Sequence, residues 1–283
     1  MDLVETRMYG IVFSKVDPVS RGVFEIFNKN GNLKYRLNMG SYEVYDLGGN
    51  LAFYALDRDI VYLDDLEELL QRIPEKLQEL IFVSRHAMKN PRPMFTSHVT
   101  GNWSTAELGG KPNTISLANP HTITAFYREL CRVRHEYGLE NFECHVEATH
   151  HGPTIESMPV TFVEQGSSEN DWSVSRGGWE LLYHVVNEFL DGKLVSNSEP
   201  SISIGDLHYL TMDNRIISGE TDIGHAIPKY IKPVTEDMII KAVKMMIDKP
   251  TKAYVSWKSI DNETRKVVTE ALNRLGIRII KRT

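Results

Sequence analysis

SISIG at residues 201–205, KAYVSW at 252–257 and IRII at 277–280 are short apolar runs that decide the fold of this chain. Two longer stretches, 235–248 and 261–275, lie between them, and each has the length and pattern of an amphipathic helix. Strands that alternate with helices of this size are typical of βα units, in which the strands lie parallel. The C-terminal third therefore predicts an α/β fold with helices on both faces of a mostly parallel mixed sheet.

The rest of the chain continues the same alternation. MYGIVFSK (8–15) predicts the first strand, and Asp17-Pro18 and Asn30-Gly31 are the start and stop signals of a helix between them. Further strands are predicted at 42–48, 50–57, 80–84, 142–149 and 159–165, and further helices at 64–79 (interrupted at Pro74), 121–138 and 177–192. Since no repeat or Pro/Ser-rich linker divides the sequence, we expect residues 1–283 to form one domain.

Residues from about 99 to 120 follow neither a helical nor a strand period and are rich in Gly, Asn, Pro and Thr. A connection of this length is uncommon inside a compact domain and usually carries function. We therefore expect a functional loop or lid in this segment.

Composition excludes several classes of protein. Of 283 residues, 41% are hydrophobic and 25% charged, which is average for a globular protein. The first residues place acids before a short apolar run, unlike a secretory signal, and no apolar run approaches the roughly 20 residues that cross a bilayer. Cys131 and Cys144 are isolated, which favours a reducing compartment. We expect a cytoplasmic protein with no membrane or DNA partner, as a monomer or small homo-oligomer.

Charge is distributed unevenly along the chain. The formal net charge is −6, yet the region 241–283 carries eleven basic and four acidic residues and is therefore at +7. A basic segment on an acidic body can attract a polyanion, because phosphate contacts release counterions. The alternative is an ordinary solvated helix face.

Histidines and acids gather at predicted strand ends, which is where open α/β sheets bind ligands. The candidate clusters are Ser84-Arg85-His86, Ser97-His98 with Val99-Thr100, Glu147 to Pro153, Glu164 with Ser167-Ser168, Asp206 with His208, and His225 with Lys229. Arg85, Thr100, Ser167 and Lys229 are the candidate substrate-binding residues: Ser167 lies in a turn whose backbone N–H groups can hold an anion, and Lys229 can contact a phosphate.

EATHHGP (147–153) is the strongest local feature. Strand alternation places Glu147 and Thr149 on one face, and the strand then runs into His150 and His151. Imidazole and carboxylate are the usual zinc ligands, so His98, His151, Glu164 and His225 are the candidate metal ligands. Adjacent histidines normally point apart, so we expect only one of the pair to bind metal. The alternative is that these histidines are hydrogen-bonded turn or surface residues.

Other catalytic templates are missing from the sequence: it contains no GxSxG nucleophile elbow, no GxGxxG or Walker A loop and no HExxH. The residues alone therefore indicate a hydrolase with a possible zinc site, and go no further.

A set of uncommon strings, in order, resembles the archaeal-type D-aminoacyl-tRNA deacylases, a family that also has plant members. The strings are IVFSKVDPVS (11–20), SRHA (84–87), TSHVTGNW (96–103), EATHHGPT (147–154), VEQGSS (163–168), IGDLHY (204–209) and GHAIPKY (224–230). The resemblance implies hydrolysis of the ester between a D-amino acid and the terminal ribose of tRNA, with zinc as cofactor. It also implies an α/β core akin to nucleoside phosphorylases and peptidyl-tRNA hydrolases.

The residue roles are a hypothesis from chemistry. Zinc held by two or three of the four candidate ligands would activate water, with Glu147 and His150 as the catalytic residues that handle its proton. A pocket that sterically rejects the L side chain would select the D-amino acid. Two alternatives remain open: a metallopeptidase or amidohydrolase acting on small substrates, and a non-catalytic tRNA- or nucleotide-binding module.

Overall fold

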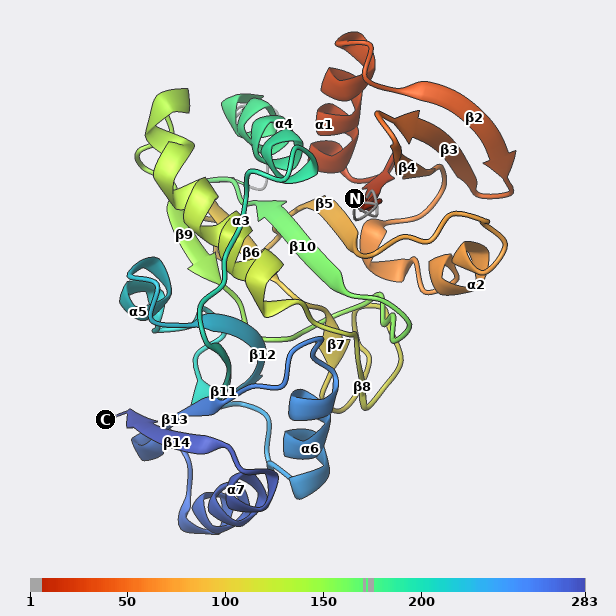
Figure 1. Ribbon diagram of the computed structural model, residues 1–283. Helices are drawn as coiled ribbons and strands as arrows, with labels where there is room; N and C mark the ends of the chain where they lie inside the picture. The colour runs from red at the N-terminus through yellow and green to blue at the C-terminus, as the bar shows by residue number, and fades with distance from the viewer. Residues whose placement is uncertain (1–6, 170–171, 173–175, 283) are drawn as a thin grey trace, which may run out of the picture.

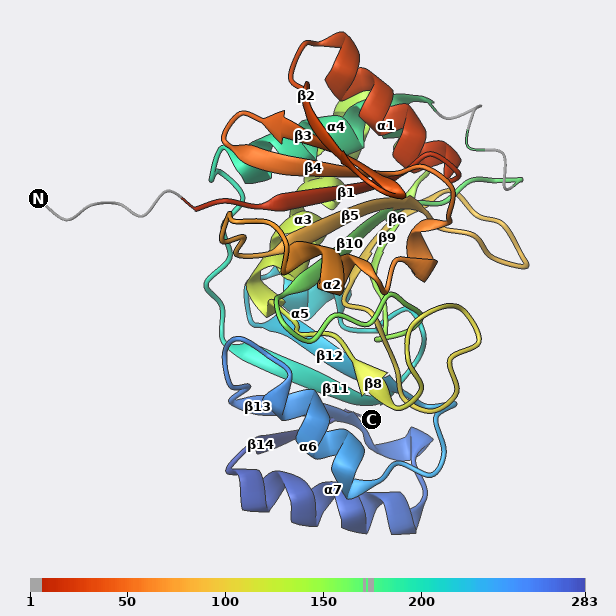
Figure 2. The same ribbon diagram turned by 90° about the vertical axis from the view of Figure 1, so that its right-hand side faces the viewer.

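The computed structural model describes residues 7–169, 172 and 176–282, and its strands form two main sheets, one above the other (Figures 1 and 2). The large sheet has the order β2 (Lys34–Met39), β3 (Tyr42–Leu47), β4 (Asn50–Ala55), β1 (Gly10–Ser14), β5 (Leu80–Arg85), β10 (Val160–Gln165), β6 (Met94–His98) and β9 (Glu143–Val146). The small sheet has the order β12 (Asp222–Pro228), β11 (Pro200–Asp206), β13 (Lys252–Ser256) and β14 (Arg278–Arg282). A short pair, β7 (Gly101–Asn102) and β8 (Thr114–Ile115), stands apart.

The predicted mostly parallel α/β fold is confirmed. All neighbours in the small sheet are parallel, as are β4, β1, β5 and β10 in the large one. The β2–β3–β4 strands pair antiparallel, and β6 runs antiparallel to β10. This reversal at β6 carries the chain toward the small sheet.

Helices cover both faces of the large sheet. The helices α1 (Pro18–Lys29), α3 (Pro120–Val133) and α4 (Arg176–Leu190) pack on one face, where Phe13 and Val163 are buried (Figure 1). The short helices η1 (Ile60–Tyr62) and α2 (Leu66–Leu70) pack on the other, over Phe82 and Phe162. Alternation along each strand separates these two apolar layers.

The small sheet lies between α3 and two C-terminal helices. The helices α6 (Glu236–Lys244) and α7 (Asn262–Leu275) lie on its outer side (Figure 2), while Ile123 and Tyr127 of α3 join the same core from the inner side. The remaining short helices are α5 (Asp213–Ile217), η2 (Arg134–Tyr137) and η4 (Trp257–Ser259). Because α3 contacts β6, β9 and β12, it joins the two sheets.

Several local signals act as the sequence predicts. Asp17 caps α1, accepting a 2.9 Å hydrogen bond from the Ser20 N–H, and Pro18 begins the helix. The helix predicted at 64–79 is shorter than expected and ends at Leu70, before Pro74. The strands β2, β6 and β12 were not predicted; β12 contains Gly224 and His225 and is buried along its whole length. Across the residues described, no helix has the length and apolar character needed to span a membrane.

One buried carboxylate lies at the amino end of β5. Glu79 is 2% exposed and accepts hydrogen bonds from Thr161 (2.9 Å), Thr122 and the Asn119 amide (both 2.8 Å). Burial outweighs these bonds and raises the pKa of Glu79 to about 7. The folded chain therefore holds a proton here that the unfolded chain releases between about pH 4.5 and pH 7.

We predict that Glu79 makes the protein less stable as pH rises through this window, because the native state then binds more protons than the unfolded state. Replacing Glu79 with Gln removes the titration, and the Thr161 hydroxyl can turn to accept from the new amide. Relative to wild type, the Glu79→Gln variant should gain up to about 3 kcal/mol of unfolding free energy between pH 5 and pH 8. Urea unfolding at both pH values measures this difference. Parallel pH profiles for the two proteins would contradict it.

Candidate active site

Histidines and carboxylates converge where the large sheet meets the small one. Glu164 of β10 stands opposite Ser84 of β5 on one side and Thr96 of β6 on the other. The chain after β9 leaves the large sheet and joins the small one, since the Ala148 N–H donates to the His208 carbonyl (2.8 Å). This crossing brings Glu147 and the two histidines that follow it up to Glu164.

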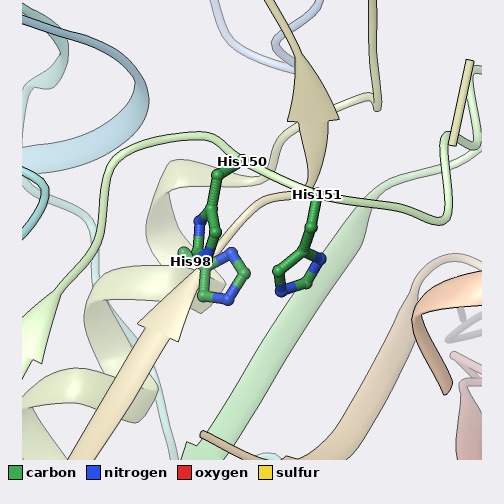
Figure 3. A group of neighbouring side chains, drawn as sticks. All are labelled: His98, His150 and His151. Atoms are coloured by element: carbon green, nitrogen blue, oxygen red, sulfur yellow. The ribbon is translucent and has the colours of Figure 1, made fainter. Parts of the chain in front are cut away.

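Three imidazoles, those of His98, His150 and His151, point toward one another (Figure 3). The Nδ1 atom of each lies against a backbone carbonyl: that of Val99 at 3.2 Å, that of Ala148 at 2.8 Å and that of Gly152 at 2.6 Å. A carbonyl only accepts, so each Nδ1 carries hydrogen, which leaves the Nε2 lone pair available when the ring is neutral. The Nε2 atom of His98 is buried and has no hydrogen-bond partner among the described residues.

The backbone at His151 explains why two adjacent histidines face the same centre. His151 has a φ of 42°, a left-handed conformation that non-glycine residues seldom adopt. This conformation brings the rings of His150 and His151 to 4.3 Å between centroids. The expectation that adjacent histidines point apart is wrong here, because the left-handed backbone at His151 turns the two rings toward each other. Strained backbone of this kind is common at functional sites.

Glu147 is a buried carboxylate without a hydrogen-bond partner. It is 1% exposed, and neither oxygen has a partner of good geometry in the part of the chain that the structure describes. Its Oε2 lies 3.3 Å from the Nε2 of His150 and 3.8 Å from that of His208. A buried carboxylate that no hydrogen bond satisfies is costly, so this arrangement favours positive charge beside Glu147.

Glu164, in contrast, is held firmly. It accepts from the Ser84 hydroxyl (2.7 Å) and pairs with the Nδ1 of His86 (2.8 Å). His86 Nδ1 is also 3.1 Å from Glu147, and its Nε2 is 2.8 Å from the Tyr209 hydroxyl. His86 therefore bridges the two carboxylates and fixes their separation.

The two carboxylates favour positive charge within the cluster. Burial alone would lower the pKa of His86, but Glu147 and Glu164 outweigh it and raise the pKa to about 9. The pKa of His98 is raised as well: burial alone would lower it, but the same two carboxylates outweigh burial. Burial and then the neighbouring imidazoles hold the pKa of His150 well below its ordinary value. For Glu164, burial would raise the pKa, yet the surrounding imidazoles keep it well below the usual range.

Two cavities meet at His150 and His151. One has a volume of about 470 Å³ and also includes Arg85, His86, Glu164 and Tyr209 in its walls. The other, about 380 Å³, includes Trp103 and Tyr230. Leu108 borders both, so the segment 99–120 contributes to the walls of both cavities. The histidines are thus accessible to a ligand from two directions.

The structure brings together His98, Glu147, His150, His151 and Glu164, but not His225. The Nδ1 of His225 is 3.0 Å from the Thr149 hydroxyl, and its Nε2 is 2.9 Å from the Met245 carbonyl. Burial lowers the pKa of His225 to about 4, so this ring is neutral with both nitrogens engaged. It positions residue 149, one step before the paired histidines.

The predicted substrate-binding residues fall in different places. Arg85 borders the larger cavity but is already paired with Asp17 and Asp59. Thr100 is buried and contacts the Pro153 carbonyl (2.6 Å), so it anchors the 99–120 loop.

Ser167 and Lys229 lie away from the cavity walls. Ser167 is buried beyond the end of β10, and its hydroxyl accepts from the Glu169 N–H (3.3 Å). Lys229 is exposed, between the cavity residues Pro228 and Tyr230.

Sequence reasoning gave no role to His86, His208 or Tyr209, although the first two stood in candidate clusters. Their position along the chain could have indicated a role. His86 follows the buried strand β5, and His208 and Tyr209 follow β11, and ligands bind at the carboxyl ends of such parallel strands. The contact of Tyr209 with His86 depends on how the two sheets meet, and no local pattern reports that.

An α/β fold with accessible cavities over clustered imidazoles and carboxylates is typical of an enzyme active site. Comparison with known proteins identifies the family. Residues 73–280 match the family model described as D-aminoacyl-tRNA deacylase. A relative from Caldivirga maquilingensis with that name is 39% identical over 96% of this chain and 98% of its own.

Further relatives agree with this assignment. The D-aminoacyl-tRNA deacylase of Pyrobaculum calidifontis is 32% identical over 96% of this chain and 99% of its own. The crystal structure of a conserved protein of unknown function, 26% identical, superposes with a TM-score of 0.84 and covers 97% of this chain and 95% of that one. This chain belongs to the D-aminoacyl-tRNA deacylase family.

Gly152 lies against the backbone of the 99–120 loop. A Cβ atom on Gly152 would lie 2.2 Å from the Gly110 nitrogen, 2.4 Å from the Gly109 carbonyl carbon and 2.6 Å from the Val61 oxygen. All three are backbone atoms and cannot yield by a side-chain rotation. The absence of a side chain at Gly152 therefore lets the loop close over His151.

We predict that Gly152→Ala destabilises the protein by about 1–3 kcal/mol, the usual cost of overpacking, and loosens the 99–120 loop. Gly177→Ala on α4 is a matched control, since its new Cβ would come no closer than 3.3 Å to other atoms and alanine favours a helix. Thermal unfolding of both variants measures the difference. Equal midpoints for both variants and wild type would show that the close approach does not constrain the site.

Proposed function

We propose that this protein hydrolyses the ester bond of D-aminoacyl-tRNA and releases the free D-amino acid and tRNA. The observation that carries this proposal is that three imidazoles of fixed tautomer lie beside the buried carboxylate of Glu147, which accepts no hydrogen bond of good geometry from the described residues, at the junction of two cavities. The names of the related proteins supply the substrate class.

We further propose that zinc is the cofactor. His98, His150 and His151 would hold it, because their Nδ1–H groups are engaged by backbone carbonyls, as is usual for metal-binding histidines. Glu147 and Glu164 would balance its charge; the His98 Nε2 is 3.7 Å from each of them, too far for a hydrogen bond. Bound zinc would supply Lewis-acid chemistry that makes water nucleophilic near neutral pH.

The chain's own residues then have distinct tasks. Glu147 takes the proton of the attacking water, since its oxygens are buried, accept no hydrogen bond of good geometry from the described residues, and include Oε2 beside His150. Glu164, held by Ser84 and His86, keeps its orientation through the reaction. The leaving group is a ribose oxygen, which departs as a hydroxyl and needs little acid assistance. Glu147 can therefore pass the proton taken from water to this oxygen, and no second acid is required.

Removal of metal tests the cofactor. Chelator-treated protein should lose hydrolysis of D-tyrosyl-tRNA and regain it on addition of zinc. His98→Ala should bind zinc at least about tenfold more weakly, because loss of an imidazole removes a ligand that only its neighbours could replace. Zinc content after dialysis and the rate of tyrosine release are the measurements.

The matched control is His135→Ala, an exposed histidine in η2, which should keep both zinc and activity. Full activity of the metal-free protein would remove zinc from the reaction.

The Glu147→Gln variant tests the base. The substitution preserves shape but removes the proton acceptor, so the kcat for D-tyrosyl-tRNA should fall by about 10²–10⁴ while zinc content and thermal midpoint stay close to wild type. A wild-type kcat would refute the role of Glu147.

The same assay with L-tyrosyl-tRNA and a D-amino-acid dipeptide tests the substrate class. The wild-type protein should release D-tyrosine from tRNA and leave the other two substrates intact. Cleavage of the dipeptide in preference to the ester would favour a metallopeptidase instead.

A further inference from the structure

The carboxyl edge of the small sheet carries a concentration of unpaired positive charge. Its four strands are parallel, and their last residues align, with Asp206 opposite Pro228 and Ser256 opposite Arg282. Five basic residues lie at or near these strand ends. Lys229 and Lys232 follow β12, Lys258 lies in η4 after β13, Arg265 lies near the start of α7, and Lys281 lies near the end of β14. In the described part of the chain, none of these five lies within 4 Å of a carboxylate oxygen.

Basic residues elsewhere in the C-terminal region are mostly neutralised. At the amino edge of the same sheet, Lys252 and Arg278 both pair with Glu199, at 2.8 and 3.4 Å. On the outer helices, Lys241 pairs with Asp237 (2.9 Å) and Arg274 with Glu236 (2.7 Å). In the region 241–283, Lys258, Arg265 and Lys281 thus gather without an ion pair at the carboxyl edge. Lys244, Lys249 and Lys266 also form no ion pair among the described residues, but they lie on α6, in the turn after it and on α7.

An aromatic side chain lies among these cations. Lys281 Nζ is 4.1 Å and the Arg265 guanidinium 5.7 Å from the centre of the half-buried Trp257 ring. Arg265 also donates to the Trp257 carbonyl at 2.8 Å, which orders it without neutralising its charge. Ordered cations around an aromatic ring are a common arrangement for binding single-stranded nucleic acid.

This edge is continuous with the active site. Tyr230, 55% exposed, follows β12 and borders the 380 Å³ cavity. Its hydroxyl is 3.0 Å from His208 Nδ1, and the His208 Nε2 is 3.8 Å from Glu147. A ligand lying along the edge would therefore reach the cavity beside Tyr230 and end next to the catalytic carboxylate.

We propose that the carboxyl edge of the small sheet binds the phosphates of the tRNA acceptor end, and that the terminal adenosine enters the cavity beside Tyr230. This inference rests on the proposed function for the identity of its ligand. The charge pattern favours a polyanion, because the chain as a whole is at −6 and only local, unpaired cations can attract one.

The test is the salt dependence of binding of uncharged tRNA, measured by fluorescence anisotropy for the wild type and for Lys258→Ala/Lys281→Ala. Each lost phosphate contact to a single strand lowers the slope of log K against log salt by about 0.7, so the double variant should lose about 1.4. The control is Lys244→Ala/Lys249→Ala, which removes two exposed lysines from the end of α6 and the amino-edge turn after it. The control should keep the wild-type slope.

Equal slopes in wild type and the Lys258/Lys281 variant, or an equal loss in the control, would overturn the proposal. Because the measurement uses uncharged tRNA, it decides the binding surface whether or not the protein hydrolyses D-tyrosyl-tRNA. A selective loss of slope without any hydrolysis by the wild type would support the surface and refute the proposed function.

Discussion

The backbone carbonyls that accept hydrogen from three histidine Nδ1 atoms are the interaction on which the site depends. They fix the tautomer of His98, His150 and His151, so that each neutral ring presents its Nε2 lone pair. Since the acceptors belong to residues 99, 148 and 152, the same turns that shape the chain also orient the rings. The backbone, and not additional side chains, thus sets the tautomer and orientation of the three rings.

That backbone is in turn held by both sheets. The reversal at β6 and the crossing after β9 deliver His98 and Glu147 from the large sheet, and hydrogen bonds to residues 208 and 226 fasten the crossing to the small one. The left-handed conformation at His151 is a strained feature that the surrounding structure must enforce, and the close backbone approach at Gly152 requires a residue without a side chain. This explains why the site lies at the junction of the sheets: neither sheet alone supplies all of its supports.

Much of the fold could be predicted because it is encoded locally. The cap of α1 at Asp17 and the apolar run of β5 each carry their signal within a few residues. Strand alternation also predicted that Glu147 and Thr149 lie on one face of a strand that runs into the histidine pair. The strands β6 and β12 escaped prediction because they hold polar residues in buried positions, where tertiary contacts decide the conformation. The division into two sheets depends on which strands pair, and no single segment records that.

The site residues likewise divide into those that local sequence predicts and those whose position depends on tertiary contacts. His98, Glu147, His150, His151 and Glu164 could be predicted as candidates from residue type and strand-end position, and the structure brings them together. His225 has the same residue type and a similar context, yet its strand turns both ring nitrogens toward internal partners. His86 bridges the two carboxylates, which is a consequence of register between β5 and β10 rather than of any motif.

The central claim is that imidazole nitrogens, and not the thiols of Cys131 and Cys144, form the metal site. A zinc K-edge X-ray absorption spectrum of the zinc-loaded protein tests it most directly. The predicted result is a shell of nitrogen and oxygen neighbours at about 2.0–2.1 Å, with the outer-shell pattern of imidazole rings. A sulfur neighbour at about 2.3 Å, or a nearest shell without imidazole behind it, would contradict the account.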